Sequence, residues 1–222
     1  MAASSRFDFS LYLVTDRRLA GEFSLTELVS KAVAGGVTVV QLREKDCSTR
    51  EFLEMALAVK KILPAGIPLI INDRLDIALA AGADGIHLGQ SDLPAEIARK
   101  YLGPEAIIGL SVENFDQLRE AINLPVDYLA ISPVFPTPTK TDTGPAWGIE
   151  GLRRARSFTE KPLVAIGGIN GTNVVEVVKA GADGVAVVSA ICAATDPVEA
   201  ARRLRRLIES ARKKQAVSAE EK

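Results

Sequence analysis

Short apolar runs alternate along the chain with stretches whose apolar residues have helical spacing. The run over 37–43 opens with Val37-Thr38-Val39-Val40, a β-branched segment typical of a buried strand. The pattern predicts strands over 11–15, 37–43, 68–71, 85–88, 106–110, 128–132, 163–166 and 185–189, and helices over 24–34, 49–63, 74–81, 94–101, 114–122, 148–156, 171–180 and 197–213.

Repeated strand–helix units with nearly continuous apolar strands favour an α/β fold with a closed parallel sheet, the (βα)₈ TIM barrel. An open doubly wound sheet is the alternative, and it usually carries a glycine-rich fingerprint after the first strand. Val14-Thr15-Asp16-Arg17-Arg18 has no such glycines. We therefore predict a single domain over 1–222, with a core from about 11 to 213 and a frayed polar tail over 215–222.

One short motif occurs twice. Ala81-Gly82-Ala83-Asp84-Gly85 recurs as Ala180-Gly181-Ala182-Asp183-Gly184, each time between a predicted helix and the next strand. Glycine suits the left-handed end of a helix and a tight turn into a strand. Such turns lie at the stable end of a barrel, so we predict structural roles for Asp84 and Asp183.

Composition and charge narrow the class of partner. The chain has 222 residues, 47% hydrophobic and 25% charged, with a formal net charge of −1. This balance is typical of a globular enzyme and not of a disordered or fibrous chain, and it indicates neither a nucleic-acid nor a membrane partner. Two cysteines without zinc-ligand spacing and no apolar signal segment predict a cytoplasmic protein with free thiols. A homo-oligomer remains open.

Cations gather where the second strand ends. If the strand persists, alternation puts Gln41, Arg43 and Lys45 on one face, and Leu42 and Glu44 on the other. Cations on a buried face are costly without a counter-charge, and a phosphorylated ligand suits both Arg and Lys. The alternative is a surface strand end with Arg43 paired to a nearby carboxylate.

Two carboxylates follow neighbouring strands. Asp73 comes after the third strand and Asp92 after the fourth, so both belong to the end of the barrel where active sites lie. Two such oxygen ligands suit Mg²⁺ shared with substrate phosphates. The alternative is helix capping, by Asn72 or Asp73 before Arg74, and by Ser91 or Asp92 before the next helix.

The sixth strand is followed by a long loop, over 132–144, stiffened by three prolines. Thr137, Thr139 and Lys140 in this loop have the hydroxyls and the point charge that bind a phosphate. A rigid surface loop is the alternative.

Other polar or flexible positions also lie at strand ends. Gly167-Gly168 follows the seventh strand, where barrels commonly bind phosphate, although such a pair also serves any tight turn. Ser111 follows the fifth strand and either donates to substrate or caps the next helix. The lone histidine, His87, lies within a strand, and we predict a core residue with satisfied hydrogen bonds.

These motifs together resemble the thiamine-phosphate synthase family. The resemblance runs from about residue 11 to 208, and its motifs keep their order along the chain. They are Gln41-Leu42-Arg43-Glu44-Lys45, Asn72-Asp73, His87-Leu88-Gly89-Gln90 with Asp92, Pro136-Thr137-Pro138-Thr139-Lys140, Gly167-Gly168-Ile169, and Val188-Ser189.

The resemblance implies a Mg²⁺-dependent transferase of thiamine biosynthesis. Such an enzyme joins 4-amino-2-methyl-5-(diphosphomethyl)pyrimidine to a thiazole phosphate, giving thiamine phosphate and pyrophosphate. The resemblance assigns the pyrimidine diphosphate to Gln41, Leu42, Arg43, Glu44, Lys45, Asn72, Ser111 and Lys140, the thiazole phosphate to Thr137, Thr139, Gly168, Val188 and Ser189, and Mg²⁺ to Asp73 and Asp92. Arg43, Lys45 and Lys140 would stabilise charge during catalysis.

Two rival functions remain open. One is a metal-independent isomerase of a thiazole phosphate or sugar phosphate, for which His87 is the one imidazole that the sequence offers. The other is a regulatory protein that binds phosphorylated ligands without catalysis. Trp147, just after the long loop, would either cover the thiazole site or pack on the sixth helix.

Overall fold

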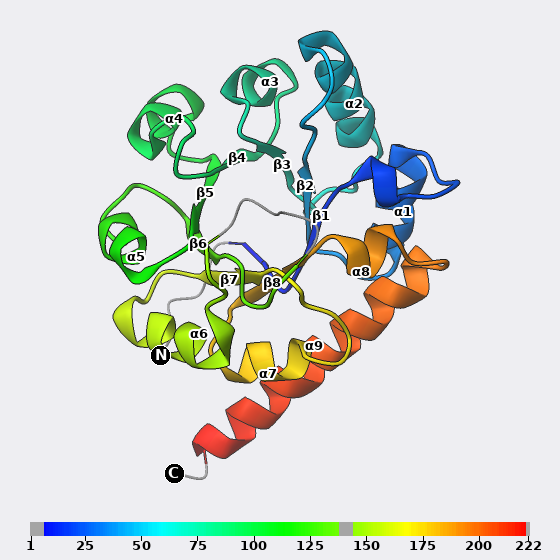
Figure 1. The fold of residues 1–222 in the computed structure, drawn as a ribbon. Helices are drawn as coiled ribbons and strands as arrows, with labels where there is room; N and C mark the ends of the chain where they lie inside the picture. Colours follow the sequence, from blue (N-terminus) through cyan, green and yellow to red (C-terminus); the bar gives the residue numbers. More distant parts are fainter. Residues whose placement is uncertain (1–6, 138–143, 221–222) are drawn as a thin grey trace.

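A closed ring of parallel strands forms the centre of the molecule (Figure 1). A computed structural model describes residues 7–137 and 144–220, and side chains as far as residue 215. The strands are β1 (Leu11–Val14), β2 (Val39–Leu42), β3 (Leu69–Asn72), β4 (Gly85–Leu88), β5 (Ile107–Val112), β6 (Tyr128–Ile131), β7 (Leu163–Ile166) and β8 (Gly184–Val187). Each strand pairs in parallel with the next, and β8 pairs with β1. The predicted TIM barrel is confirmed.

The helices surround the strands, and α9 packs against α7, α1 and β1 (Figure 1). They are η1 (Arg17–Leu19), α1 (Leu25–Ala34), α2 (Thr49–Ile62), α3 (Leu75–Ala80), α4 (Ala95–Leu102), α5 (Phe115–Ala121), α6 (Gly148–Phe158), α7 (Val174–Lys179), α8 (Ser189–Cys192) and α9 (Pro197–Glu220). None of these helices, over the residues described, has the length and apolar character of a membrane span.

Several element boundaries differ from the sequence prediction by one to three residues, and two differences concern the site and the tail. The eighth strand ends at Val187 and not at Ser189, because Ser189 begins the one-turn helix α8. Helix α9 continues to Glu220, past the predicted end at Lys213, so part of the predicted frayed tail is helical. The two cysteines are free thiols, as predicted.

Two apolar layers stabilise the barrel. The larger lies between strands and helices, and the smaller fills the barrel interior, where Tyr12 and Tyr128 are fully buried. Gly109 makes room for the second tyrosine, since a Cβ at this position would lie 2.0 Å from the Tyr128 Cζ. The interior is therefore packed and not a pore, and substrates can enter only at an end.

Aspartates stabilise the amino-terminal rim of the barrel. Asp84 accepts hydrogen bonds from the backbone N–H of Leu69 (2.8 Å) and from Lys60 Nζ (2.7 Å). The same arrangement recurs at Asp127, with Ile108 and Arg99, and at Asp183, with Leu163 and Arg156. The structural roles predicted for Asp84 and Asp183 are confirmed, and Asp127 has the same role.

Candidate active site

A cavity of about 310 Å³ lies at the carboxyl ends of the strands. Among the residues predicted from the sequence, its lining includes Gln41, Arg43, Lys45, Asn72, Asp73, Asp92, Ser111, Thr137, Gly168, Val188 and Ser189. Thr139 and Lys140 lie outside the described residues. Residues far apart in the sequence therefore meet here because each follows a different strand of one ring.

The end of β2 supplies the cations. The regular strand ends at Leu42, yet Arg43 and Lys45 still line the cavity with Gln41, as alternation predicted. Leu42 is fully buried in the layer between strands and helices, on the opposite face. The Glu44 side chain is likewise turned away, and Arg17 Nε binds it at 2.7 Å. The side chains of Leu42 and Glu44 therefore do not line this cavity, although the family resemblance assigned both to substrate.

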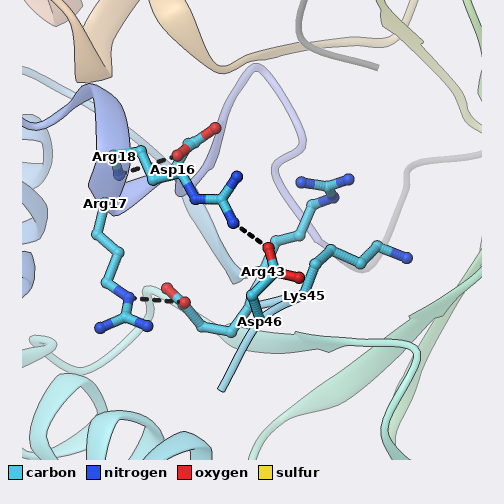
Figure 2. Close-up of a pocket in the computed structure, with 7 residues that line it drawn as sticks. Asp16, Arg17, Arg18, Arg43, Lys45 and Asp46 are labelled. Atoms are coloured by element: carbon cyan, nitrogen blue, oxygen red, sulfur yellow. Dashed lines mark hydrogen bonds and ion pairs between the residues drawn. The ribbon is translucent and has the colours of Figure 1, made fainter. Parts of the chain in front are cut away.

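A second cavity, of about 410 Å³, shares Arg43 and Lys45 with the first (Figure 2). Arg17 forms an ion pair with Glu44. Figure 2 shows Arg18 joined to Asp46, across the loops that follow β1 and β2. Arg43 and Lys45 extend away from Arg17 in this view. Arg43 makes no ion pair among the described residues, so this part of the chain gives no support to the alternative of a surface pair.

Asp73 and Asp92 do not cap helices. Helix α3 begins after Arg74 and α4 after Pro94, and neither start has a side-chain cap. Instead Asp92 Oδ2 accepts from the backbone N–H of Gly89 at 2.7 Å, and Asp73 Oδ2 accepts from Lys45 Nζ at 2.8 Å. The backbone of Asp73 also has a φ of +63°, unusual for a residue with a side chain and frequent at functional sites.

The two carboxyl groups influence each other. Burial and a hydrogen bond with the Asp73 side chain raise the pKa of Asp92 above its ordinary value. Two adjacent carboxylates with one ammonium group, that of Lys45, favour a further cation. The described residues contain no group of three or more His, Cys, Asp or Glu that could hold a metal by themselves. This donor set fits Mg²⁺, which commonly takes one or two carboxylates and completes its shell with water and phosphate oxygens.

The loops after β6 and β7 pack closely at the far side of the cavity. Gly168 has a φ of +65°, and a Cβ there would lie 2.8 Å from Phe135 Cβ and from the Pro136 carbonyl oxygen. Glycine is therefore required for both conformation and space. Thr137 follows Pro136 in the chain and lines the cavity, as does Ser189, the first residue of α8.

A hydrogen-bonded group lies at the floor of the cavity. His87 Nδ1 lies 2.8 Å from Tyr128 Oη, and His87 Nε2 lies 2.8 Å from Ser111 Oγ. The histidine thus has bonds at both ring nitrogens, as predicted, and it also lines the cavity. Ser111 does not cap the following helix, since Asn114 caps α5.

Sequence reasoning missed Tyr12 and Tyr128, which were counted only as members of apolar strands. Their hydroxyl groups lie 2.8 Å apart, and Tyr12 Oη also accepts from Gln41 Nε2 at 2.9 Å. The available signal was a hydroxyl in a strand predicted to be fully buried, because such a group must find a partner. Trp147 packs on Phe115, with ring centroids 4.8 Å apart, and is not part of the cavity lining.

Comparison with known proteins identifies the family of this chain. Residues 11–191 match the family described as thiamine monophosphate synthase. A thiamine-phosphate synthase of Albidiferax ferrireducens is 61% identical over 201 residues, covering 90% of this chain and 92% of the relative. Its counterpart in Vibrio parahaemolyticus is 55% identical, covering 90% and 98%.

A solved structure gives the same result. The thiamine phosphate pyrophosphorylase of Pyrococcus furiosus superposes with a TM-score of 0.84 at 40% identity, covering 93% of this chain and 98% of that chain. A family match over most of the chain, together with relatives of this identity, also establishes an enzyme of the transferase class. The chain belongs to the thiamine monophosphate synthase family.

Proposed function

We propose that this protein is a Mg²⁺-dependent thiamine-phosphate synthase. It would join 4-amino-2-methyl-5-(diphosphomethyl)pyrimidine to a thiazole phosphate, releasing pyrophosphate. The observation that carries the proposal is one cavity that combines the adjacent carboxyl groups of Asp73 and Asp92 with the cations of Arg43 and Lys45. Family membership supports the same assignment.

The diphosphate would bind at the β2 side of the cavity. Arg43 makes no ion pair among the described residues, and Lys45 has Asp73 as its counter-charge. Asn72, at the end of β3, makes no side-chain hydrogen bond within the described parts of the chain, which leaves its amide available to a ligand. Arg43 and Lys45 supply charge-assisted hydrogen bonds to phosphate oxygens. Lys140 would join them, and it lies outside the described residues.

The thiazole phosphate would bind where the loops after β6, β7 and β8 line the cavity. Barrels of this class frequently hold phosphate between the loops after strands seven and eight and the start of a short extra helix. Gly168 and Val188 lie in those two loops, and α8 begins at Ser189. Thr137 adds a hydroxyl from the loop after β6, and Thr139 would add another from the part of this loop outside the described residues.

The chemistry is a substitution at the methylene carbon of the pyrimidine. The bond from this carbon to the diphosphate oxygen breaks, leaving a resonance-stabilised cation, and the thiazole nitrogen then forms a bond to the same carbon. Arg43 and Lys45 stabilise the negative charge that develops on the diphosphate. Asp73 and Asp92 would hold Mg²⁺, which adds positive charge at the leaving group. The enzyme needs no nucleophilic side chain, and its contribution is positioning and charge stabilisation.

The described residues disfavour the isomerase alternative. An isomerase needs an acid–base group that can reach its substrate. His87 is the only histidine of the chain, and Tyr128 and Ser111 occupy its two ring nitrogens. A metal-independent isomerase would also not need Asp73 and Asp92 together beside two cations.

An assay with both substrates tests the proposal directly. Purified protein, the pyrimidine diphosphate, the thiazole phosphate and Mg²⁺ should give thiamine phosphate and pyrophosphate in equal amounts. Omitting either substrate, or removing Mg²⁺ with a chelator, should stop the reaction, and added Mg²⁺ should restore it. Conversion of one substrate without the other would favour an isomerase, and tight binding without turnover would favour a regulatory protein.

A further inference from the structure

Five side chains form one continuous hydrogen-bond chain across the barrel interior. Gln41 Nε2 contacts Tyr12 Oη (2.9 Å), which contacts Tyr128 Oη (2.8 Å), and this contacts His87 Nδ1 (2.8 Å). His87 Nε2 in turn contacts Ser111 Oγ at 2.8 Å. The two ends, Gln41 and Ser111, line the active-site cavity, while both tyrosines lie below it. This hydrogen-bond chain therefore connects the walls of the site formed by β2 and β5 through the floor of the cavity.

The two tyrosines restrict where the hydrogens can lie along this hydrogen-bond chain. Tyr12 is 1% exposed and Tyr128 is 0% exposed, so water cannot replace a missing partner. Burial raises the pKa of both hydroxyl groups, which keeps them protonated. Each hydroxyl thus has one hydrogen to donate, and a buried hydrogen without an acceptor is costly.

The orientation of Gln41 decides the direction of the chain. Its amide nitrogen faces Tyr12, so Tyr12 accepts there and must donate its own hydrogen to Tyr128. Tyr128 then donates to His87 Nδ1, which leaves the histidine hydrogen on Nε2, donated to Ser111. With the Gln41 nitrogen facing Tyr12, the reverse direction or a doubly protonated histidine would leave the Tyr12 hydrogen without an acceptor among the described residues.

We propose that this chain fixes the polarity of the active-site walls, making Ser111 a hydrogen-bond donor and the Gln41 carbonyl oxygen an acceptor toward substrate. Tyr12, Tyr128 and His87 are then positioning residues, since the two tyrosines act on the substrate only through Gln41 and Ser111. The inference rests on the proposed function for the identity of the substrate. The polarity itself follows from the Gln41 amide nitrogen facing Tyr12 and from the hydrogen bonds that continue to Ser111.

An aminopyrimidine matches this polarity. Its amino group donates to an acceptor such as the Gln41 carbonyl, and its ring nitrogens accept from a donor such as the Ser111 hydroxyl. The 4-oxo counterpart has a carbonyl in place of the amino group and a proton on a ring nitrogen, so donor and acceptor are exchanged. A site with fixed polarity rejects that compound, because buried polar groups would be left without partners.

The first test measures directly which ring nitrogen of His87 carries the hydrogen. Because His87 is the only histidine, ¹⁵N-histidine labelling gives the imidazole signals of one residue. In the ligand-free protein we expect a neutral ring with its hydrogen on Nε2 and none on Nδ1. A hydrogen on Nδ1, or on both nitrogens, would overturn the proposed polarity whatever the enzyme's activity.

The second test measures selectivity in Tyr12→Phe and Tyr128→Phe, which remove one hydroxyl each and keep the ring. Tyr101→Phe is the matched control, since this tyrosine is 60% exposed on α4. We compare kcat/KM for the 4-amino substrate with that for its 4-oxo counterpart. The preference for the amino compound should fall by roughly ten- to hundred-fold in both interior variants and stay unchanged in the control. The KM for the thiazole phosphate should not change in any of the three.

Failures of the two proposals are distinguishable. Wild-type protein that makes no thiamine phosphate overturns the proposed function, while the histidine signals still test the polarity. An active wild type whose interior variants keep the selectivity of Tyr101→Phe overturns the polarity proposal alone. If Tyr128→Phe does not fold, Tyr12→Phe and the wild-type histidine signals decide the outcome.

Discussion

The aspartates at the two ends of the barrel have opposite environments. At the amino-terminal rim, Asp84, Asp127 and Asp183 each accept from a backbone N–H and from a cation of their own. At the carboxyl-terminal mouth, Asp73 has Lys45, and Asp92 has one backbone N–H and the neighbouring carboxyl group. The rim carboxylates are satisfied by the protein itself, and the mouth carboxylates are not.

This difference indicates where the chain is built for stability and where for function. A carboxylate with a complete set of partners has nothing left to bind, so its contribution is to the folded state. A pair of adjacent carboxylates with one ammonium group is unfavourable by itself and is stabilised by an added cation. Substitutions at the two ends should therefore separate stability from activity.

The largest expected effect is at the mouth. Asp92→Asn keeps an oxygen for the Gly89 N–H and removes the charge, and we expect kcat to fall on the order of 100-fold or more. The free energy of unfolding should stay within about 1 kcal/mol, because a repulsion between carboxylates is also removed. Mg²⁺ titrations of activity, with urea unfolding of the same samples, measure both. A destabilised Asp92→Asn variant with full activity would contradict the functional role of the mouth aspartates, because it would behave as expected for a rim aspartate.

The next effect separates the two substrates. Arg43→Ala should weaken binding of the pyrimidine diphosphate by roughly ten- to hundred-fold, through loss of a charge-assisted contact. Binding of the thiazole phosphate should be unchanged, and calorimetric titration of each ligand separately tests this. Arg18→Ala, in the adjacent cavity of Figure 2, is the matched control and should bind both ligands normally. Equal weakening for both ligands in Arg43→Ala would show that the two phosphate sites are not distinct.

At the rim, the effect should be on stability alone. Asp183→Ala removes the partner of the Leu163 N–H and of Arg156, and we expect a loss of about 1–3 kcal/mol in the free energy of unfolding. Activity below the unfolding transition should be unchanged, since Asp183 does not line the active-site cavity. A fall in kcat without a fall in the urea midpoint would contradict the structural role.

The smallest effect is expected for an exposed ion pair at the mouth. Arg18 binds Asp46 across the loops after β1 and β2, and both side chains are more than half exposed. Arg18→Ala should therefore cost less than about 1 kcal/mol of stability, and less still at high salt. Urea unfolding at two salt concentrations measures this. A larger loss in the free energy of unfolding would contradict this view. It would mean that the number of partners of a charged group does not decide how much that group contributes to stability.

Much of the site was predictable because its residues follow predicted strands. Gln41, Arg43 and Lys45 line one cavity as alternation required, and Asp73, Asp92, Ser111 and Gly168 meet there because all follow strands of one ring. The sequence could not predict which polar groups pair with one another by hydrogen bonds or ion pairs. Asp73 and Asp92 were also plausible helix caps, and only the observed starts of α3 and α4 exclude that role.

The sequence by itself determined the barrel, because the local spacing of apolar residues predicts each strand–helix unit. Turn motifs such as those of Asp84 and Asp183 mark the ends of two of these units. The tertiary structure alone decided the contacts inside it. Tyr12 and Tyr128 are 116 positions apart, and only closure of the ring brings their hydroxyl groups to 2.8 Å. Such contacts depend on side chains converging from strands across the ring, and no local pattern records which of them will meet.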